Sequence, residues 1–329
     1  MYSNHRRLSY SLAINEAIHQ LMETDESVFL IGQGVESPWY VGNTAKGLLE
    51  RFGSNRVIDT PVSENAITGA AVGASLVGMR PIVIHPRMDF MLYALDPIIN
   101  QAGNWFYMSG GAMSVPLVIW GIINRGGEQA AQHSQAIHAM FAHCPGLKVV
   151  MPSNPYDAKG LLISAVRDEN PVIYIDDRWL YGVEDYVPEE IYEIPIGQAI
   201  IRKEGEDVTI AADSYMVNTA LKASVELERI GINCEVIDLR SIKPLDKLTI
   251  LQSVWKTGRL VIADVGWKSF GTSSEISATV CEEAFEALKA PIVRVALPDT
   301  PAPASRVLED VYFPRESDII RAVQGIIKL

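Results

Sequence analysis

A carboxylate at the end of a short apolar run is the first group in the sequence with the type and surroundings that a reaction needs. Glu64 follows the run that ends in Asp-Thr-Pro at 59–61, and residues 66–78 behind it are nearly all small. Open α/β sheets bind ligands where a strand leads into a helix at a polar turn, and small side chains let a cofactor approach closely. The other interpretation, which this stretch taken alone favours, is a Ser63 or Asn65 cap on an Ala/Gly core helix.

An imidazole is the second candidate. His133 lies within Ala-Gln-His-Ser-Gln at 131–135, just after a glycine-containing loop. Histidine titrates near pH 6.5 when unperturbed, so it can carry protons at neutral pH. Taken alone, the position is more typical of a structural histidine with satisfied ring nitrogens. The spacing of the nearby His85, His138 and His143 does not suit one metal site, since nothing supplies a third or fourth ligand.

Phosphate anchors are missing from the sequence. There is no Gly-x-Gly-x-x-Gly after the first apolar run and no loop that ends in Gly-Lys-Ser/Thr. Thiamine enzymes usually bind Mg and the cofactor's diphosphate through a Gly-Asp-Gly motif with a downstream Asn. This motif does not occur either. Any site in this chain therefore lacks its own diphosphate anchor.

The elements that must position these groups alternate between short apolar runs and amphipathic segments. This alternation predicts two doubly wound α/β domains, over 1–190 and 197–329, with a Glu-, Pro- and Tyr-rich linker at 183–196. In the first domain the expected strands are 28–32, 80–85, 115–120, 147–151 and 171–175, with a loop over 121–132 and a helix over 90–103; in the second they are 208–212, 234–239, 260–265 and 292–297.

Composition excludes several classes of protein. The 329 residues carry a net charge of -12, so no basic patch predicts nucleic-acid binding. No apolar run approaches the roughly 20 residues of a membrane span, and residues 1–7 have no apolar signal region. The three cysteines fit neither a metal site nor a disulfide framework, which favours a reducing cytoplasm.

A series of short motifs follows the order seen in one family. They are Ile-Asp-Thr-Pro-Val-Ser-Glu at 58–64, Gly-Met-Arg-Pro at 78–81, Tyr-Met-Ser-Gly-Gly at 107–111, Ala-Gln-His-Ser-Gln at 131–135, Cys-Pro-Gly-Leu-Lys-Val-Val at 144–150, Asp-Ala-Lys-Gly-Leu-Leu at 157–162, Val-Ile-Asp-Leu-Arg at 236–240 and Lys-Thr-Gly-Arg-Leu at 256–260. From about residue 8 to the C-terminus, the chain resembles the beta subunits of the thiamine-diphosphate-dependent 2-oxo-acid dehydrogenases. That group includes the pyruvate, branched-chain 2-oxo-acid and acetoin dehydrogenases.

The resemblance implies an organisation and a reaction. Residues 1–190 would be a transketolase-like pyrimidine-binding domain, and 197–329 a transketolase C-terminal domain. The chain would join an alpha subunit in an alpha2-beta2 heterotetramer, with Mg and the diphosphate held by the alpha chain and, as a further partner, a lipoyl acyltransferase core. The complex would decarboxylate a 2-oxo acid, or cleave a related ketone, and transfer the acyl group.

The resemblance also implies roles for single residues. Glu64 matches the glutamate that bonds the aminopyrimidine ring of thiamine diphosphate, and Phe90 matches the aromatic that packs on that ring. His133 matches the histidine that handles protons or the incoming lipoyl group. Gln33 is a further residue expected to bind the cofactor. A structural potassium ion would be held by Leu117, Ala165, Asp168 and Asn170.

Three departures from the family pattern surround the predicted site. Gln33 stands where the family usually has a glutamate, which puts a proton path between paired active sites in doubt, and the stretches 84–87 and 120–125 differ from their usual forms. An alternative function is therefore a split transketolase or synthase subunit that transfers an activated aldehyde to a sugar-like acceptor. Another is a partner that has lost catalysis, against which the retention of Glu64, Phe90 and His133 argues.

Overall fold

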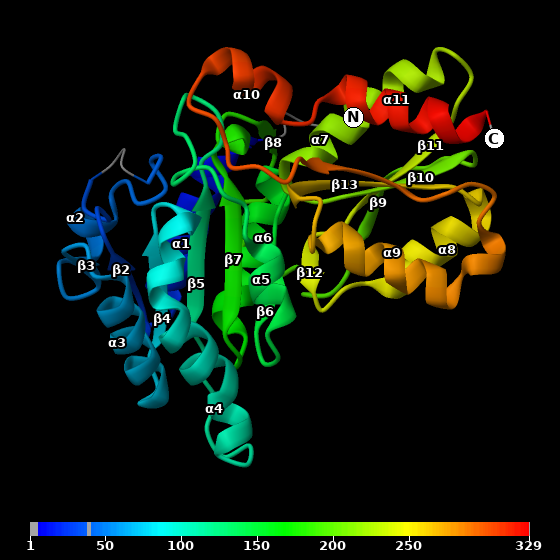
Figure 1. Cartoon of the computed structure of the whole chain (residues 1–329). Coiled ribbons are helices and arrows are strands. Elements are labelled where there is room, and N and C mark those ends of the chain that lie inside the picture. Colours follow the sequence, from blue (N-terminus) through cyan, green and yellow to red (C-terminus); the bar gives the residue numbers. More distant parts are fainter. Residues whose placement is uncertain (1–5, 38–40, 329) are drawn as a thin grey trace. The chain divides into compact units, whose positions relative to one another are not determined.

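The computed structural model describes residues 6–37 and 41–328, which form two compact units (Figure 1). One unit comprises Met1–Arg125 and Met140–Ile196, and the other Gly126–Ala139 and Gly197–Leu329. The predicted doubly wound α/β fold is confirmed in both. The residues on which the prediction of no secretion rests, 1–7, lie mostly outside the described part of the chain.

A parallel sheet forms the centre of the first unit. Its strands run in the order β6-β7-β5-β4-β2-β3, so the order reverses between β2 and β4, and the carboxyl ends of all six lie at one edge. Ligands of open α/β sheets bind at such a reversal. The strands are β2 (Val28–Gly32), β3 (Val57–Asp59), β4 (Arg80–His85), β5 (Val118–Ile123), β6 (Lys148–Val150) and β7 (Val172–Asp177).

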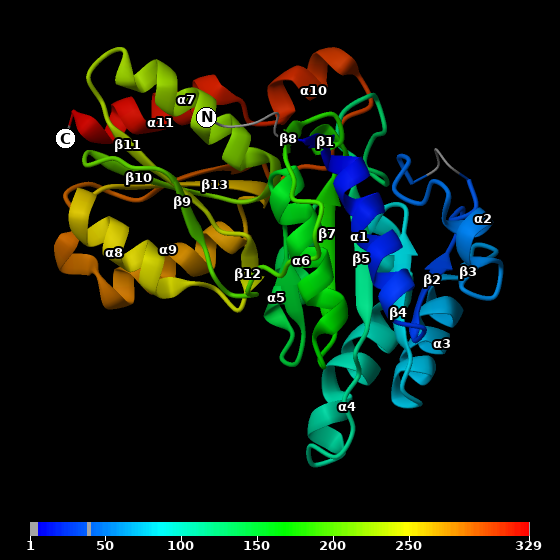
Figure 2. The same ribbon diagram turned by 180° about the vertical axis from the view of Figure 1, so that it is seen from behind.

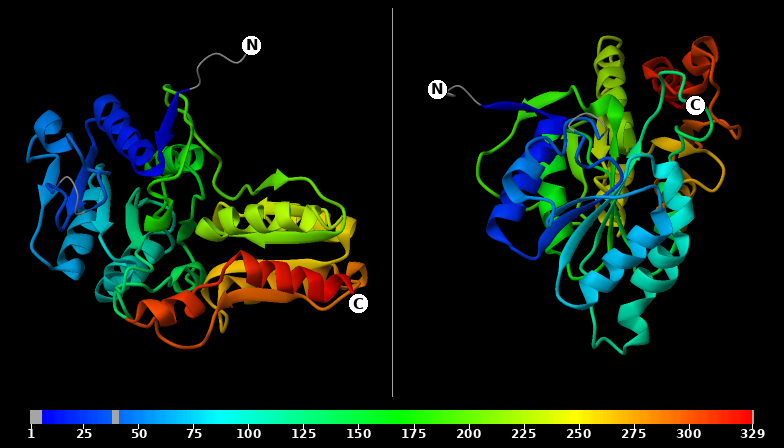
Figure 3. Two further views of the ribbon diagram at one scale, coloured as in Figure 1. Left: turned by 90° about the horizontal axis from the view of Figure 1, so that it is seen from above. Right: turned by 90° about the vertical axis from the view of Figure 1, so that its left-hand side faces the viewer.

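Helices cover both faces of this sheet, as the right-hand view in Figure 3 shows. α1 (Tyr10–Thr24) and α6 (Pro155–Arg167) pack together on the face seen in Figure 2, and α3 (Glu64–Leu76) packs on β4 from the other face. The remaining elements are α2 (Leu48–Phe52), the 3-10 helices η1 (Met88–Ala94) and η3 (Arg178–Leu180), the π-helix η2 (Asp96–Ala102), α4 (Gly103–Met108), α5 (His138–His143), β1 (Arg7–Ser9) and β8 (Glu184–Tyr186).

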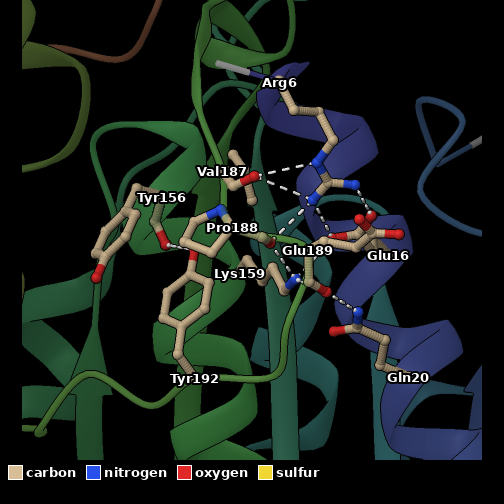
Figure 4. Close-up of polar contacts among 9 residues, drawn as sticks. All are labelled: Arg6, Glu16, Gln20, Tyr156, Lys159, Val187, Pro188, Glu189 and Tyr192. Carbon is tan, nitrogen blue, oxygen red and sulfur yellow. Dashed lines mark hydrogen bonds and ion pairs between the residues drawn. The ribbon is translucent and has the colours of Figure 1, made fainter. Parts of the chain in front are cut away.

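Residues 183–196, which we interpreted as a linker, are built into the framework of the first unit. β8 pairs with β1 in antiparallel register. The fully buried Lys159 donates from Nζ to Glu16 Oε1 at 2.6 Å and to the Pro188 carbonyl at 2.7 Å, and Arg6 donates to the Val187 carbonyl at 3.1 Å (Figure 4). A buried ammonium is stable only when paired and hydrogen-bonded, so these contacts fix the segment against α1 and α6.

The second unit contains a five-stranded sheet in the order β14-β13-β10-β11-β9. Only β9 is antiparallel to its neighbour. α7 and α11 pack together on one face, and α8 and α9 on the other (Figures 1 and 2). The elements are β9 (Ile200–Lys203), β10 (Val208–Ala212), α7 (Ser214–Glu228), β11 (Cys234–Asp238), β12 (Ser241–Lys243), α8 (Lys247–Thr257), β13 (Leu260–Trp267), α9 (Thr272–Glu283), η4 (Phe285–Ala287), β14 (Val293–Leu297), α10 (Arg306–Tyr312) and α11 (Glu316–Ile327).

Two predicted elements of the first unit differ from the structure. The strand expected at 115–120 is β5 at Val118–Ile123, because Pro116 has no N–H for a ladder bond and Ile122 and Ile123 continue the apolar run. The expected loop therefore begins only after Ile123. The helix expected over 90–103 is divided into η1, η2 and α4.

Candidate active site

The Glu64 side chain lies at the carboxyl edge of the first sheet. Glu64 is the first residue of α3, in the turn that follows β3, and it is half-buried. Ser63 occupies the N-cap position but its side chain makes no cap hydrogen bond. Asn65 donates instead to the Tyr93 carbonyl at 3.4 Å. Neither residue caps the helix through its side chain, so the structural interpretation of this stretch loses its main support.

Phe90 is carried by an element that packs directly on the helix of Glu64. It lies in η1, which follows β4, and η1 and α3 are in contact. Its ring is half-buried. The structure thus brings the predicted carboxylate and the predicted aromatic residue onto neighbouring elements at one edge of the sheet.

Gln33 belongs to the same edge. It directly follows β2, and the next two backbone N–H groups, of Gly34 and Val35, donate to Asp59 Oδ1 at 2.6 and 3.1 Å. Thr60, the next residue after β3, has a buried hydroxyl oxygen without a hydrogen-bond partner. This orphaned hydroxyl, with the Glu64 carboxylate nearby in the chain and the Phe90 ring on η1, fits a bound group that has both polar edges and a flat apolar face.

His85 is a further polar group at this edge that we did not predict as a site residue. It ends β4, is fully buried, and lies with Nε2 3.2 Å from Thr68 Oγ1, one helical turn after Glu64. Burial lowers the pKa of His85 to about 4, so the ring is neutral at physiological pH. Its Nδ1 atom has no hydrogen-bond partner.

The ends of β5 and β7 hold a second polar group of residues at the carboxyl edge. Arg125 and Asp177, both buried, form an ion pair at 2.6 Å, and the Arg125 guanidinium lies 5.4 Å from the Trp179 ring centre. Asp176 accepts a 2.9 Å hydrogen bond from the Tyr181 hydroxyl. The sequence signal for these acids was two aspartates directly after an apolar strand, which we did not use.

The ionisation of Asp176 predicts how stability depends on pH. Burial raises the pKa of Asp176 from 3.8 to about 7, although Tyr181 opposes the shift. The folded protein then holds a proton that the unfolded chain releases, so the contribution of this group to stability falls between about pH 4 and pH 7.

Asp176→Asn should remove that decline. The difference in unfolding free energy between the variant and the parent protein should therefore increase by on the order of a few kcal/mol from pH 5 to pH 8. Urea unfolding at both values measures the gain, with the exposed Asp185→Asn as the control. An equal difference between variant and parent at both pH values would show that Asp176 ionises normally.

His133 lies in a segment, Gly126–Ala139, that groups with the second unit. The side chain is half-buried, and its backbone N–H donates to the Ala130 carbonyl at 3.3 Å. Four backbone positions before it are left-handed, with φ of 72° at Gly126, 65° at Gly127 and 61° at both Glu128 and Ala130. For the two non-glycine residues this conformation costs about 1–2 kcal/mol each, so other contacts must hold the loop.

Asp213 and Asp264 of the second unit meet His138 at the end of this segment. All three are buried, and one ligand atom from each lies within 4.8 Å of the others. Among the described residues, they form a group of His and Asp side chains that could hold a metal ion. However, Asp264 Oδ1 lies 3.2 Å from His138 Nε2, which is a hydrogen-bond distance, and both carboxylates also accept backbone N–H groups. The sequence could not predict this group, because strand and helix packing joins residues far apart in the chain.

The predicted potassium ligands gather at the opposite, amino-terminal edge of the first sheet. Leu117 precedes β5, and Ala165 lies in the last turn of α6, whose final carbonyls have no helical partner. Asp168 and Asn170 precede β7, and the Asp168 carbonyl accepts from Arg80 at 3.2 Å. Carbonyl and carboxylate oxygens at a helix C-terminus are a donor set that suits a hard cation.

Comparisons with known proteins agree with this arrangement. The family model for the transketolase pyrimidine binding domain matches residues 6–183, and the one for the transketolase C-terminal domain matches 197–319. A split-gene transketolase, solved as an inactive beta4 tetramer, has a TM-score of 0.80 at 24% identity and covers 98% of this chain and 99% of its own. Transketolase from Campylobacter jejuni has a TM-score of 0.73 at 12% identity, over 99% of this chain and 48% of its own. At these identities the likeness shows the fold alone.

Curated relatives are much more similar. The beta subunit of acetoin:2,6-dichlorophenolindophenol oxidoreductase from Cupriavidus necator is 46% identical over 98% of both chains. The beta subunit of the pyruvate dehydrogenase E1 component is 46% identical in Rickettsia felis, over 95% of this chain and 96% of that one, and 44% identical in Bos taurus, over 96% and 90%.

Fold and family models together define a two-domain protein of the transketolase type. Within that class, the chain belongs to the family of the pyruvate and acetoin dehydrogenase beta subunits. The resemblance identified from the sequence motifs is thus confirmed. In the described part of the chain, no helix has the length and apolar character to cross a membrane.

Proposed function

We propose that this chain is the beta subunit of a thiamine-diphosphate-dependent 2-oxo-acid dehydrogenase that decarboxylates a pyruvate-like substrate and transfers the acyl group. The observation that carries the proposal is the similarity of almost the whole chain to beta subunits that act on pyruvate and acetoin. It favours the dehydrogenase over a split transketolase, whose likeness is limited to the fold. The two proposed domains are residues 1–190, for pyrimidine binding, and 197–329.

The residues of this chain would bind and orient the cofactor. Glu64, at the start of α3 and free of a capping role, would hydrogen-bond the aminopyrimidine ring and hold a proton at its ring nitrogen. Phe90, on the adjoining η1, would pack on the flat face of that ring, and Gln33 would contact the same side of the site. When bound, thiamine diphosphate supplies the electron sink that decarboxylation of a 2-oxo acid requires.

His133 would move a proton at the incoming acyl acceptor. Its half-buried ring, in a loop with several left-handed residues, suits a group that must reach a substrate and still be held in place. The neutral His85 ring behind Thr68 would keep charge away from the first turn of α3. Leu117, Ala165, Asp168 and Asn170 would hold a potassium ion at the other edge of the sheet, where it would stabilise the fold without contacting the reaction.

A partner follows from the missing diphosphate anchor. We propose an alpha subunit that holds Mg and the diphosphate, an alpha2-beta2 assembly, a lipoyl acyltransferase core as acceptor, and a cytoplasmic location. Exposed apolar side chains of the first unit support an interface, since large apolar patches usually mark binding surfaces. Tyr107 at the end of α4 is 88% exposed, and Tyr93 and Met108 are also exposed.

Cofactor binding tests the two-chain arrangement. We expect this chain alone to bind thiamine diphosphate weakly, because it has no diphosphate anchor, and the complex with its alpha partner to bind it at least 100-fold more tightly, which corresponds to about 2.7 kcal/mol. Isothermal titration with Mg present measures both. Submicromolar binding by this chain alone would contradict the proposal.

A further inference from the structure

The second unit holds the loop that carries His133 through two contacts at its two ends. We propose that two residues of the second unit position this loop: His138, which contacts Asp264, and Glu309 of α10. They would thereby fix the position of His133. The inference rests on the proposed role of His133 in acyl transfer. The loop is the blue-green segment beside α10 in Figures 1 and 2.

The contact after His133 in the chain, between His138 and Asp264, is formed by buried groups. His138 is fully buried, and its Nε2 lies 3.2 Å from Asp264 Oδ1 and 3.9 Å from Asp213 Oδ2. Burial alone would raise the pKa of Asp264, but His138 and the backbone N–H groups of Gly266 and Ser273 outweigh it and lower the pKa, so the carboxylate is ionised at neutral pH. An ionised carboxylate 3.2 Å from the ring nitrogen attracts it strongly, because both groups are removed from water.

The Asp264 carboxylate is itself held in place by backbone N–H groups. Asp264 lies within β13, and its two oxygens accept from Gly266 at 2.8 Å and from Ser273 at 2.9 Å. The ring also packs closely on Gly266, since a Cβ atom there would lie 2.8 Å from His138 Cε1 and 3.2 Å from the Ala136 carbonyl. The backbone just after His133 is therefore packed on a strand of the second sheet.

The contact before His133 restrains the strained part of the loop. Glu309, which is buried in α10, accepts a hydrogen bond from the backbone N–H of Glu128 at 2.9 Å. Glu128 and Ala130 both have a φ of 61°, which non-glycine residues keep only when their surroundings enforce it. Glu309 supplies that restraint from the second unit.

Together the two contacts bracket His133 on both sides. With Glu128 held by α10 and His138 held by β13, the intervening segment has both ends fixed to one unit. A displacement of about 1 Å of a reacting group can cost about 100-fold in rate. Loss of either contact should therefore slow acyl transfer by displacing His133. His138 and Glu309 are positioning residues, since neither needs to touch the substrate.

A double-mutant cycle tests this inference in the complete complex with the alpha partner. His138→Phe keeps a ring of similar size but removes the contact of Nε2 with Asp264. Acyl transfer to free lipoamide should fall about 10- to 100-fold. Decarboxylation read with dichlorophenolindophenol, which needs no acyl acceptor, should stay within about twofold. In the His133→Ala background, His138→Phe should have no further effect, because its only action is through His133.

Matched variants separate positioning from stability. Glu309→Ala should reproduce the pattern more weakly, and His138→Gln, which can still donate to Asp264, should restore part of the acyl transfer. Glu235→Gln disturbs another fully buried, paired carboxylate of the second unit, at Lys256, and should leave acyl transfer per folded molecule unchanged. Glu235→Gln that loses acyl transfer as His138→Phe does would reduce the effect to stability and overturn the inference.

Three other results would overturn it. If His138→Phe slows the His133→Ala complex as strongly as the parent complex, the two residues act independently. If His133→Ala leaves acyl transfer intact, the proposed role of His133 itself fails. One bound metal ion per chain that is lost in His138→Phe would make the three buried residues a metal site in place of a positioning contact.

Discussion

Glu64→Gln is expected to abolish most turnover while leaving the fold and the assembly with the alpha subunit unchanged. The amide keeps the size of the side chain but cannot hold a proton at the aminopyrimidine ring. Proton-handling groups contribute about 100- to 10,000-fold to rate, and a loss in that range should appear in the complete reaction. Stability should change by less than about 1 kcal/mol, because the Glu64 side chain is half-buried and caps no helix.

Exchange of the thiazolium C2 proton of the bound cofactor, followed by NMR, measures this step directly. We expect the exchange to slow in the Glu64→Gln complex in parallel with turnover. The matched control is Glu275→Gln, since Glu275 also lies in the first turn of a helix, α9. Normal exchange in Glu64→Gln, with a small stability loss like that of Glu275→Gln, would leave Glu64 only the role of a helix-start residue.

Much of the fold could be predicted because its pattern is local. The central β-strands of the two sheets, such as β2, β5 and β10, are buried on both faces, so each appears in the sequence as a continuous apolar run bounded by polar turns. The position of Glu64 also follows from such local signals, since β3 ends at Asp59 and α3 begins at Glu64. Errors arose where a single residue changed the pattern, as at Pro116 before β5.

The polar groups that depend on burial could not be predicted in the same way. The pKa of Asp176 and that of His85 are shifted by the protein packed around them, and nothing in the neighbouring sequence reports that packing. The contact of His138 with Asp264 joins a helix start in one part of the chain to a strand far along it. The sequence therefore indicated which residues could react, but only the structure shows which ones hold them.

The loop of His133 shows this difference most clearly. From sequence, His133 follows a glycine-containing loop, and the structural interpretation of this histidine stays open. In the structure this loop groups with the second unit, and two of its left-handed residues, Glu128 and Ala130, are not glycines. A loop with such restraints is expected of a residue that acts in a fixed place, and this leads to a strong prediction for His133 itself.

His133→Ala should reduce acyl transfer by about 100-fold or more in the complex, the usual scale for a proton-handling residue. The change should cost less than about 1 kcal/mol in unfolding free energy, because the side chain is only half-buried. Decarboxylation with an artificial electron acceptor should fall much less, because that reaction ends before the acyl group is transferred. His19→Ala, in α1, is the control for loss of a half-buried imidazole.

The opposite pattern defines the structural interpretation of His133. A histidine that only supports the loop would leave turnover per folded molecule near normal, while the melting temperature of His133→Ala fell by several degrees. Measuring both quantities on one purified variant complex separates the two cases, since each predicts a large change in one quantity and a small change in the other. A destabilised variant with near-normal acyl transfer would remove His133 from the active site and leave proton transfer to another group.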